Sequence, residues 1–176
     1  MKKIIITGLI ATVIATYFWS CEKDDICADD TPTTPNMIVT FYNADNQEVR
    51  KSGRILQFME GDSIEGRDAV AVDSLVVPLR ADAESVRWGF TLVTNAPGGG
   101  LNYNTDYIEF KYTHNEVYIS RACGFKSLFY LKENTNEEPN PVLTDTIPAD
   151  NLWIQEIQVI ESNIENENTE HIKIYY

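Results

Sequence analysis

The chain has 176 residues, of which 27 are acidic and 14 are basic, so its formal net charge is −13 at neutral pH. A protein this acidic is repelled by phosphate backbones, and its composition therefore argues against nucleic-acid binding. The length is sufficient for one domain with a buried core after a short leader.

The first twenty residues have the layout of a secretory signal peptide. Lys2 and Lys3 precede a mostly apolar, uncharged stretch from Ile4 to Ser20. A basic start, an apolar centre and a small residue at the end are typical of such signals. A retained transmembrane helix is the alternative, but the stretch is short for a bilayer span, which needs about 20 residues. We therefore expect residues 1–20 to be cleaved off.

The dipeptide Ser20-Cys21 resembles the cleavage point of bacterial lipoprotein signals, in which the cysteine is acylated and becomes the new N-terminus. The resemblance implies that Cys21 carries acyl chains, and each buried methylene of such a chain contributes roughly 0.8 kcal/mol to membrane binding. Phe18 and Trp19 depart from the usual pattern, which has a leucine-like residue and then a small one. A secreted protein that is cleaved elsewhere, or not cleaved, is the alternative.

A short charged run follows the cysteine: Glu22, Lys23, Asp24 and Asp25. Carboxylates are repelled from anionic headgroups, which lifts the chain away from the membrane surface. By resemblance, "CEKDD" is similar to the acidic export tag of surface lipoproteins in bacteroidete-type bacteria, and it implies an outer-membrane protein that faces the cell exterior. A tether that faces the periplasm is the alternative. Residues 21–36, which include the Thr- and Pro-rich "ADDTPTTPN", are predicted to be an extended linker.

Three cysteines leave one candidate disulfide. If Cys21 is acylated it cannot pair, so Cys27 and Cys123 remain, an even number in an oxidising compartment. We expect these two residues to be bonded. The alternative is two free thiols, with Cys123 buried in a strand, but Cys27 lies in a polar segment that offers no core.

Residues 37–176 are predicted to form a single all-β domain. Apolar and polar residues alternate within 86–92 and within 108–113, which is the period of a half-buried strand. Turn-forming residues separate the predicted strands, including a hairpin turn at His114-Asn115. We expect an antiparallel β-sandwich of seven to nine strands, with an immunoglobulin-like layout as one option. Further β-branched and aromatic segments are predicted strands: 37–42, 53–60, 69–80, 116–125 and 127–132.

Two segments near the C-terminus are harder to read. The apolar residues of 152–164 fit either a helical stripe or a strand, and the six isoleucines and one valine from residue 153 to the end of the chain favour strands. The segment 132–150 is predicted to be a long polar loop with three prolines.

Four stretches together resemble a family of uncharacterised lipoproteins from bacteroidete-type bacteria: "CEKDDIC", "TPNMIVTFYN", "ISRACGFKSLFYL" and "NIENENTEHIKIYY". The resemblance covers most of the chain after the signal. It implies a lipoprotein with Cys21 as its anchor and with Cys27 and Cys123 at matched positions. It implies no activity, because the family has no assigned function.

No enzyme signature is present in the sequence. It contains no GxSxG, HExxH, Walker-type GK[ST] or GxGxxG pattern, and no CxxC or EF-hand spacing that would hold a metal. We therefore expect a protein that is not an enzyme and has neither cofactor nor metal. His114 and His171 are predicted to be solvated.

One Gly-rich segment, residues 94–107, is the candidate ligand loop. Aromatic faces next to amides and a carboxylate suit sugars or peptides, although a hairpin connection whose tyrosines pack on the sheet explains the same composition. The candidate ligand residues are Asn102, Tyr103, Asn104, Asp106 and Tyr107.

Three tripeptides resemble the Asp-Ser/Thr-apolar acceptor for O-glycosylation in exported proteins of bacteroidete-type bacteria. Their hydroxyl residues are Ser63, Ser74 and Thr146. Thr146 is the best candidate because it lies in the most exposed predicted loop, whereas Ser74 falls in a predicted strand.

These features favour a non-enzymatic surface lipoprotein with a binding or envelope-structural role. Its expected partners are the membrane, through acylated Cys21, and a glycan or a protein. The alternative is a carbohydrate-binding accessory of an outer-membrane uptake system. Exposed aromatic rings around Trp88 or Tyr103–Tyr107 would favour that alternative, and burial of these rings would count against it.

Overall fold

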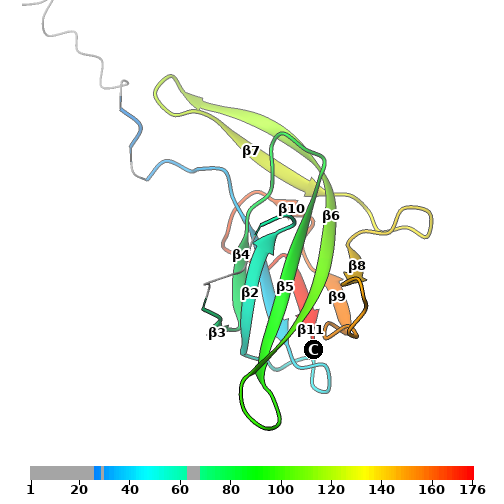
Figure 1. The fold of residues 1–176 in the computed structure, drawn as a ribbon. Helices are drawn as coiled ribbons and strands as arrows, with labels where there is room; N and C mark the ends of the chain where they lie inside the picture. The colour runs from blue at the N-terminus through cyan, green and yellow to red at the C-terminus, as the bar shows by residue number, and fades with distance from the viewer. Residues whose placement is uncertain (1–25, 29, 63–67) are drawn as a thin grey trace, which may run out of the picture. The chain divides into compact units, whose positions relative to one another are not determined.

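The computed structural model describes residues 26–28, 30–62 and 68–176. Over these residues the chain forms eleven β-strands and no helix. Figure 1 labels most of these strands. No described segment is therefore a helix long and apolar enough to cross a membrane. The chain divides into two compact units. The small unit consists of the described residues up to Thr31 together with Tyr118–Phe125, and the large unit consists of Pro32–Val117 and Lys126–Tyr176.

The strands form two sheets, which confirms the predicted all-β, sandwich-like class. The four-stranded sheet has the order β4-β1-β11-β9. The seven-stranded sheet has the order β10-β7-β6-β5-β2-β3, with β8 paired to β6. The bounds are β1 Met37–Tyr42, β2 Gly53–Met59, β3 Val70–Val72, β4 Ser74–Val77, β5 Ser85–Asn95, β6 Leu101–Ser120, β7 Gly124–Leu131, β8 Val142–Asp145, β9 Glu156–Val159, β10 Asn163–Ile164 and β11 Ile172–Tyr175.

The hydrophobic core of the large unit lies between the two sheets. Successive side chains of a strand point to opposite faces of a sheet, so burial alternates where only one face is covered. The alternation predicted for β6 is confirmed, since Ile108, Phe110 and Tyr112 are buried and the residues between them are not. In β5 the predicted positions Val86, Trp88 and Phe90 are buried, but Gly89 and Thr91 are buried as well. The core residues include Val86, Trp88 and Phe90 of β5, Ile108, Phe110 and Tyr112 of β6, Met37, Val39 and Phe41 of β1, and Ile172 and Ile174 of β11.

The strand count and one strand direction differ from expectation. We expected seven to nine antiparallel strands, whereas the described residues contain eleven, and β1 pairs with β11 in parallel. Some of the additional strands are short pieces of one predicted segment. Residues 69–80 divide at Asp73, so that β3 pairs with β2 in one sheet and β4 pairs with β1 in the other. Segment 152–164 contains β9 and β10, which confirms that strands were the better reading.

The hairpin turn predicted at His114-Asn115 is wrong. Strand β6 continues through these residues to Ser120, and the turn falls at 121–123, before Gly124. Gly124 has a φ of 71°, a left-handed conformation that glycine adopts without steric cost. Polar residues at 114 and 115 do not break the strand, because β6 is exposed along part of its length there.

The predicted polar loop 132–150 contains a strand that sequence analysis missed. Asn140 is fully buried. Both the oxygen and the nitrogen of its side-chain amide form hydrogen bonds with the backbone. Its Oδ1 accepts from the N–H of Lys111 (2.8 Å), and its Nδ2 donates to the carbonyl oxygens of Lys111 (2.9 Å) and Lys132 (2.7 Å). These bonds hold the segment against β6, and β8 then pairs with β6 from Val142 onward.

Asp106 in β6 is fully buried and holds the segment that leads into β9. Its Oδ2 accepts hydrogen bonds from the backbone N–H groups of Trp153 (2.9 Å) and Ile154 (2.8 Å). Its Oδ1 has no hydrogen-bond partner among the described residues. Burial raises the pKa of Asp106 to about 6, even though the two N–H donors favour the ionised form.

His171, directly before β11, is also fully buried, so the expectation of a solvated histidine is wrong at this position. Its Nδ1 accepts a hydrogen bond from the N–H of Ile38 (3.0 Å), and its own backbone N–H donates to the carbonyl of Ile38 (2.9 Å). These bonds join the beginnings of β1 and β11. Burial lowers the pKa of His171, although the carboxylates of Glu161 and Glu167 oppose this shift.

Replacing Asp106 with Asn should remove a pH dependence from the stability of the fold. The native carboxyl binds its proton at about pH 6, whereas the unfolded one does so near 3.8. Native protein therefore binds more protons than unfolded protein between these values, and stability decreases as the pH rises through them, by roughly 3 kcal/mol in total. Urea unfolding at intervals from about pH 4 to pH 7 should show that the stability of the wild type falls by this amount relative to Asp106→Asn as the pH rises.

The variant Asp62→Asn serves as the control, because it removes one negative charge from an exposed turn. The contribution of His171 is common to all three proteins and cancels in the comparison. An equal dependence of unfolding free energy on pH in wild type and Asp106→Asn would contradict the interpretation.

Candidate functional site

A groove with a volume of about 530 Å³ lies on the seven-stranded sheet. The strand register places Arg87 of β5 beside Glu109 of β6, and Glu109 beside Val142 of β8. Glu60 follows β2 and reaches the same region, because its N–H donates to the carbonyl of Arg87 (3.0 Å). The volume is within the range of about 300–1,000 Å³ that is typical of small-molecule sites. The lining residues are Glu60, Ser85, Val86, Arg87, Glu109, Val142 and Thr144.

Arg87 is held in place from three sides. Its Nη1 forms an ion pair with a carboxylate oxygen of Glu60, and its Nη2 donates to the hydroxyl of Thr144 (2.8 Å). Its guanidinium carbon lies 4.5 Å from the centroid of the Tyr107 ring, a cation–π contact. Among the described residues, these bonds occupy two of the five N–H donors of an arginine, so the guanidinium is positioned and keeps donors for a ligand.

A glycine makes room for the ring that supports this arrangement. A Cβ atom at Gly89 would lie between 2.2 and 2.6 Å from atoms of the Phe58 ring, so any side chain at this position would displace that ring. Phe58 in turn contacts Tyr107 edge to face, with ring centroids 6.0 Å apart. The absence of a side chain at Gly89 therefore lets the Phe58 ring pack there. Phe58 supports the Tyr107 ring, and the Tyr107 ring supports the guanidinium of Arg87.

The groove can form many hydrogen bonds. It combines the carboxylates of Glu60 and Glu109, the guanidinium of Arg87 and the hydroxyls of Ser85 and Thr144. Such a lining, with a formal charge of −1, suits an uncharged polar ligand or one with hydroxyl, amide or amino groups. Its seven residues include no histidine, cysteine or lysine.

Sequence analysis did not find this groove. Arg87 could be recognised as an outward-facing position, because the core residues Val86 and Trp88 flank it. No sequence pattern, however, places Glu60 and Thr144 next to it. They come from segments 27 and 57 residues away, and only the strand register brings them together.

The candidate ligand residues do not form one loop. After a turn at 96–100, all five belong to β6, so alternate side chains lie on opposite faces of the sheet. Asp106 is a core residue, Tyr107 supports Arg87, and Asn104 donates from Nδ2 to the carbonyl of Asn151 (2.8 Å). Asn102 and Tyr103 are exposed, and half of the Tyr103 surface is accessible. The alternative of a hairpin connection describes the segment better, because the glycines form a tight turn and Tyr107 packs against Phe58.

The aromatic rings that would have favoured a carbohydrate platform are mostly occupied. Trp88 is buried in the core, and its Nε1 donates to the carbonyl of Pro78 (3.2 Å). Trp153 is also buried, and its Nε1 donates to the carbonyl of Phe90 (3.1 Å). Tyr107 is half-buried, so Tyr103 is the only one of these rings that is largely exposed within the described part of the chain.

The two described O-glycosylation candidates both have engaged hydroxyls. Ser74 lies in β4, is half-buried, and donates to Asp73 Oδ1 (3.4 Å). Thr146, which we expected in an exposed loop, is half-buried at the end of β8, and its hydroxyl donates to the carbonyl of Pro148 (3.0 Å). The turn around Asp145 encloses it, because that carboxylate accepts from the N–H groups of Thr146 (2.6 Å) and Asn151 (3.0 Å).

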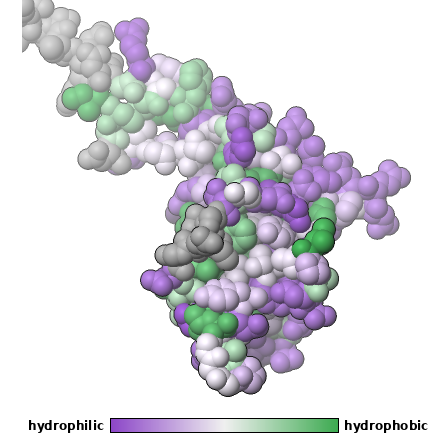
Figure 2. Space-filling model, viewed as in Figure 1, coloured by the Kyte–Doolittle hydropathy of each residue, from purple (hydrophilic) through white to green (hydrophobic). Residues whose placement is uncertain are grey.

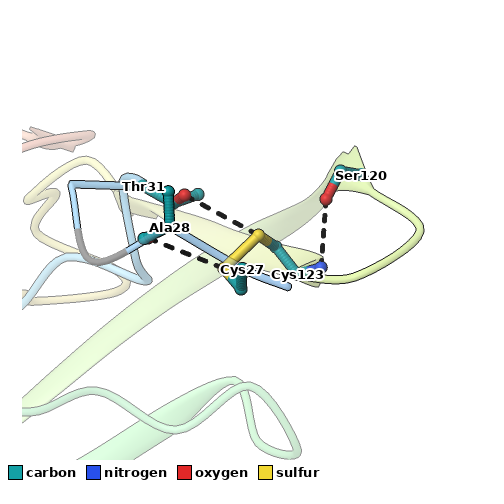
Figure 3. Close-up of a disulfide and its surroundings, with 5 residues drawn as sticks. All are labelled: Cys27, Ala28, Thr31, Ser120 and Cys123. Atoms are coloured by element: carbon teal, nitrogen blue, oxygen red, sulfur yellow. Dashed lines mark hydrogen bonds between the residues drawn. A yellow bond between two sulfur atoms is a disulfide. The ribbon is translucent and has the colours of Figure 1, made fainter. Parts of the chain in front are cut away.

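The predicted disulfide between Cys27 and Cys123 is present in the small unit, as Figure 3 shows. The two α-carbons are 4.9 Å apart, within the range that a disulfide requires. The hydroxyl of Thr31 lies 3.7 Å from the sulfur of Cys123, and the N–H of Cys123 donates to Ser120 Oγ (3.0 Å). The bond therefore joins the N-terminal segment to the turn between β6 and β7.

Several predicted positions lie outside the described residues. They are Cys21, the charged run Glu22, Lys23, Asp24 and Asp25, and the glycosylation candidate Ser63. Within the residues that are described, no group of three or more histidine, cysteine, aspartate or glutamate side chains is arranged to hold a metal ion.

Comparison with known proteins gives one match. Residues 53–176 match the model of a family whose description is a family of unknown function, DUF6452. The match begins at the first residue of β2, so it includes Cys123 but neither Cys21 nor Cys27. It agrees with the expectation of an uncharacterised family. No curated protein and no solved structure matches the chain.

Removing the disulfide should lower the stability of the oxidised protein. The bond closes a loop with a sequence separation of 96 residues, which in the chain-entropy model stabilises the fold by about 4–5 kcal/mol at most. Urea unfolding of Cys27→Ser and of Cys123→Ser should give similarly lowered midpoints, because either change removes the same bond. Reduction of the wild type should lower the midpoint to the same extent.

Cys21→Ser is the matched control, since it replaces the third cysteine and leaves the bond intact. Two thiols at positions 27 and 123 that react with an alkylating reagent in unreduced protein would contradict the prediction.

Proposed function

We propose that this chain, which belongs to the family of unknown function DUF6452, is a lipoprotein of the bacterial outer membrane that is anchored through Cys21. Its β-sandwich faces the cell exterior and has a non-enzymatic role, in binding a polar ligand or in the structure of the envelope.

The disulfide is the observation that carries this proposal. Structural disulfides persist in oxidising compartments and are rare in the cytosol, where thiols are kept reduced. The Cys27–Cys123 bond therefore favours a location outside the cytoplasm. Of the three cysteines in the sequence, the remaining one is Cys21, which follows the apolar stretch that ends at Ser20.

The sequence around Cys21 supports the finer points. The basic and then apolar residues 1–20 are typical of an export signal. The acidic run from Glu22 to Asp25 resembles the tag of surface-exposed lipoproteins of bacteroidete-type bacteria. We therefore infer the exterior face of the outer membrane and not its periplasmic face.

The groove supports binding over catalysis. Arg87 and Glu60 neutralise each other in an ion pair, and the lining residues include none of the histidine or cysteine side chains that commonly act in acid–base or nucleophilic catalysis. The carbohydrate-binding alternative has less support, because Trp88 and Trp153 are buried and cannot stack on a sugar.

Cys21→Ser should abolish lipid attachment. In the wild type, mass spectrometry of the N-terminal peptide from purified envelopes should find Cys21 as residue one with two or three acyl chains. The variant should stay uncleaved or become soluble, because no thiol remains to accept lipid. Cys27→Ser is the control, since it also replaces one cysteine with serine and should leave acylation unchanged. An unacylated mature N-terminus at any position would refute the anchor.

Replacing Glu22, Lys23, Asp24 and Asp25 together with alanine should reduce display on the cell surface. Intact cells would be treated with protease, and the loss of full-length protein would be compared between wild type and variant. We expect the wild type to be degraded and the variant to be protected, because the charged run directs export. Protection of a periplasmic marker shows that the cells are intact. Equal degradation of both proteins would sink this reading of the run.

A further inference from the structure

The small unit carries a cluster of exposed apolar side chains. Tyr118 at the end of β6 and Phe125 at the start of β7 are 58% and 64% exposed. Their rings contact each other, with centroids 5.3 Å apart and planes inclined by 66°. Ile26, next to the disulfide, is 83% exposed. We call these three residues the apolar tip.

The apolar tip differs from the core-facing part of the same two strands. There the large apolar side chains of Phe110, Tyr112 and Phe129 are fully buried, and the exposed Leu101 and Tyr103 lie at the opposite end of β6. In Figure 2 hydrophobic residues make up much of the visible surface of the small unit, whereas hydrophilic and intermediate residues cover most of the visible face of the large unit. Exposed apolar clusters of this kind mark interaction sites.

The charge of this hairpin end is also unusual for the chain. The segment Tyr118–Phe125 contains one charged residue, Arg121, and it is positive, in a protein whose net charge is −13. Arg121 is exposed. The exposed rings and the positive charge therefore favour a partner with an apolar region beside negatively charged groups. A basic protein surface would repel Arg121.

The length of the tether identifies the partner. Cys27 is bonded to Cys123 in the turn between β6 and β7, and Cys21 lies only six residues before Cys27. Six residues span at most about 20 Å even when fully extended. If Cys21 carries the lipid, the disulfide keeps the apolar tip within roughly that distance of the bilayer.

We propose that the apolar tip inserts into the interface of the bilayer that holds the lipid anchor, between headgroups and acyl chains. Aromatic side chains are enriched at this depth, because the ring enters the apolar region and a polar end, such as the Tyr118 hydroxyl, remains hydrated. An arginine next to them pairs with headgroup phosphates. The proposal rests on the proposed acylation of Cys21.

The test places a fluorescent reporter in the tip. Tyr118→Trp and Phe125→Trp would each be made in the full-length chain, extracted from envelopes and reconstituted into phosphatidylcholine vesicles with or without bromine atoms on the upper acyl chain. Bromine quenches tryptophan only at short range. Tyr103→Trp is the matched control, because Tyr103 is a tyrosine of the large unit with similar exposure, 50%. Trp88 and Trp153 are buried and supply the same background in every variant.

We expect brominated lipid to quench the tryptophans at 118 and 125 about twofold, with emission shifted to shorter wavelength, and to leave the tryptophan at 103 unchanged. If the protein is acylated and positions 118 and 103 are quenched equally little, the proposal is overturned while the lipoprotein assignment stands. A blue shift at 118 without lipid, together with a dimeric mass in solution, would overturn it in favour of a second copy of the chain.

Mass spectrometry of the same sample distinguishes failure of the proposed lipid anchor from failure of the proposed membrane contact of the apolar tip. An unacylated N-terminus would refute the proposed function, and with it the tether on which the membrane contact depends. An acylated N-terminus with selective quenching at 118 and 125 would support both.

Discussion

The buried carboxylate of Asp106 is the contact on which the large unit most depends. By accepting both N–H groups of Trp153 and Ile154, it fixes a segment that has no strand partner of its own at these residues. Trp153 then reaches both sheets. Its Nε1 bonds to Phe90 of β5, and its ring packs against Phe41 of β1 and Tyr176, with centroids 6.3 and 5.2 Å away. One side chain thus connects the two layers of the core.

Burial of the Asp106 carboxyl has an electrostatic cost. Asp106 and His171 are both fully buried, and each has one side-chain atom without a partner among the described residues. Burial raises the pKa of the acid and lowers that of the base, so the uncharged form is favoured in both cases. The consequences for stability have opposite signs. Acidification stabilises the fold through Asp106, whereas protonation of the unfolded chain at His171 destabilises it, so the two effects offset each other in mildly acidic solution.

The two features with functional potential belong to different units of the chain. The Arg87 groove is built by strand register within the large unit, and its polar lining suits a polar ligand. The apolar tip belongs to the small unit, whose disulfide joins it to the residues that follow Cys21. A single covalent bond therefore relates the proposed anchor to the hairpin end. In the two proposals, attachment and ligand binding would therefore depend on separate residues.

Much of the architecture could be read from the sequence, because it depends on local periodicity and composition. The two-residue alternation in β6, the strand preference of the C-terminal isoleucines and the pairing of Cys27 with Cys123 all followed from residue order. Contacts between distant segments did not. From the sequence we predicted Asp106 to be a ligand residue, but it bonds instead to the backbone at 153 and 154. Arg87 lines a groove only because the fold brings Glu60 and Thr144 next to it. Burial and register depend on which strands become neighbours. Long-range packing determines the neighbours, and local residue preference does not.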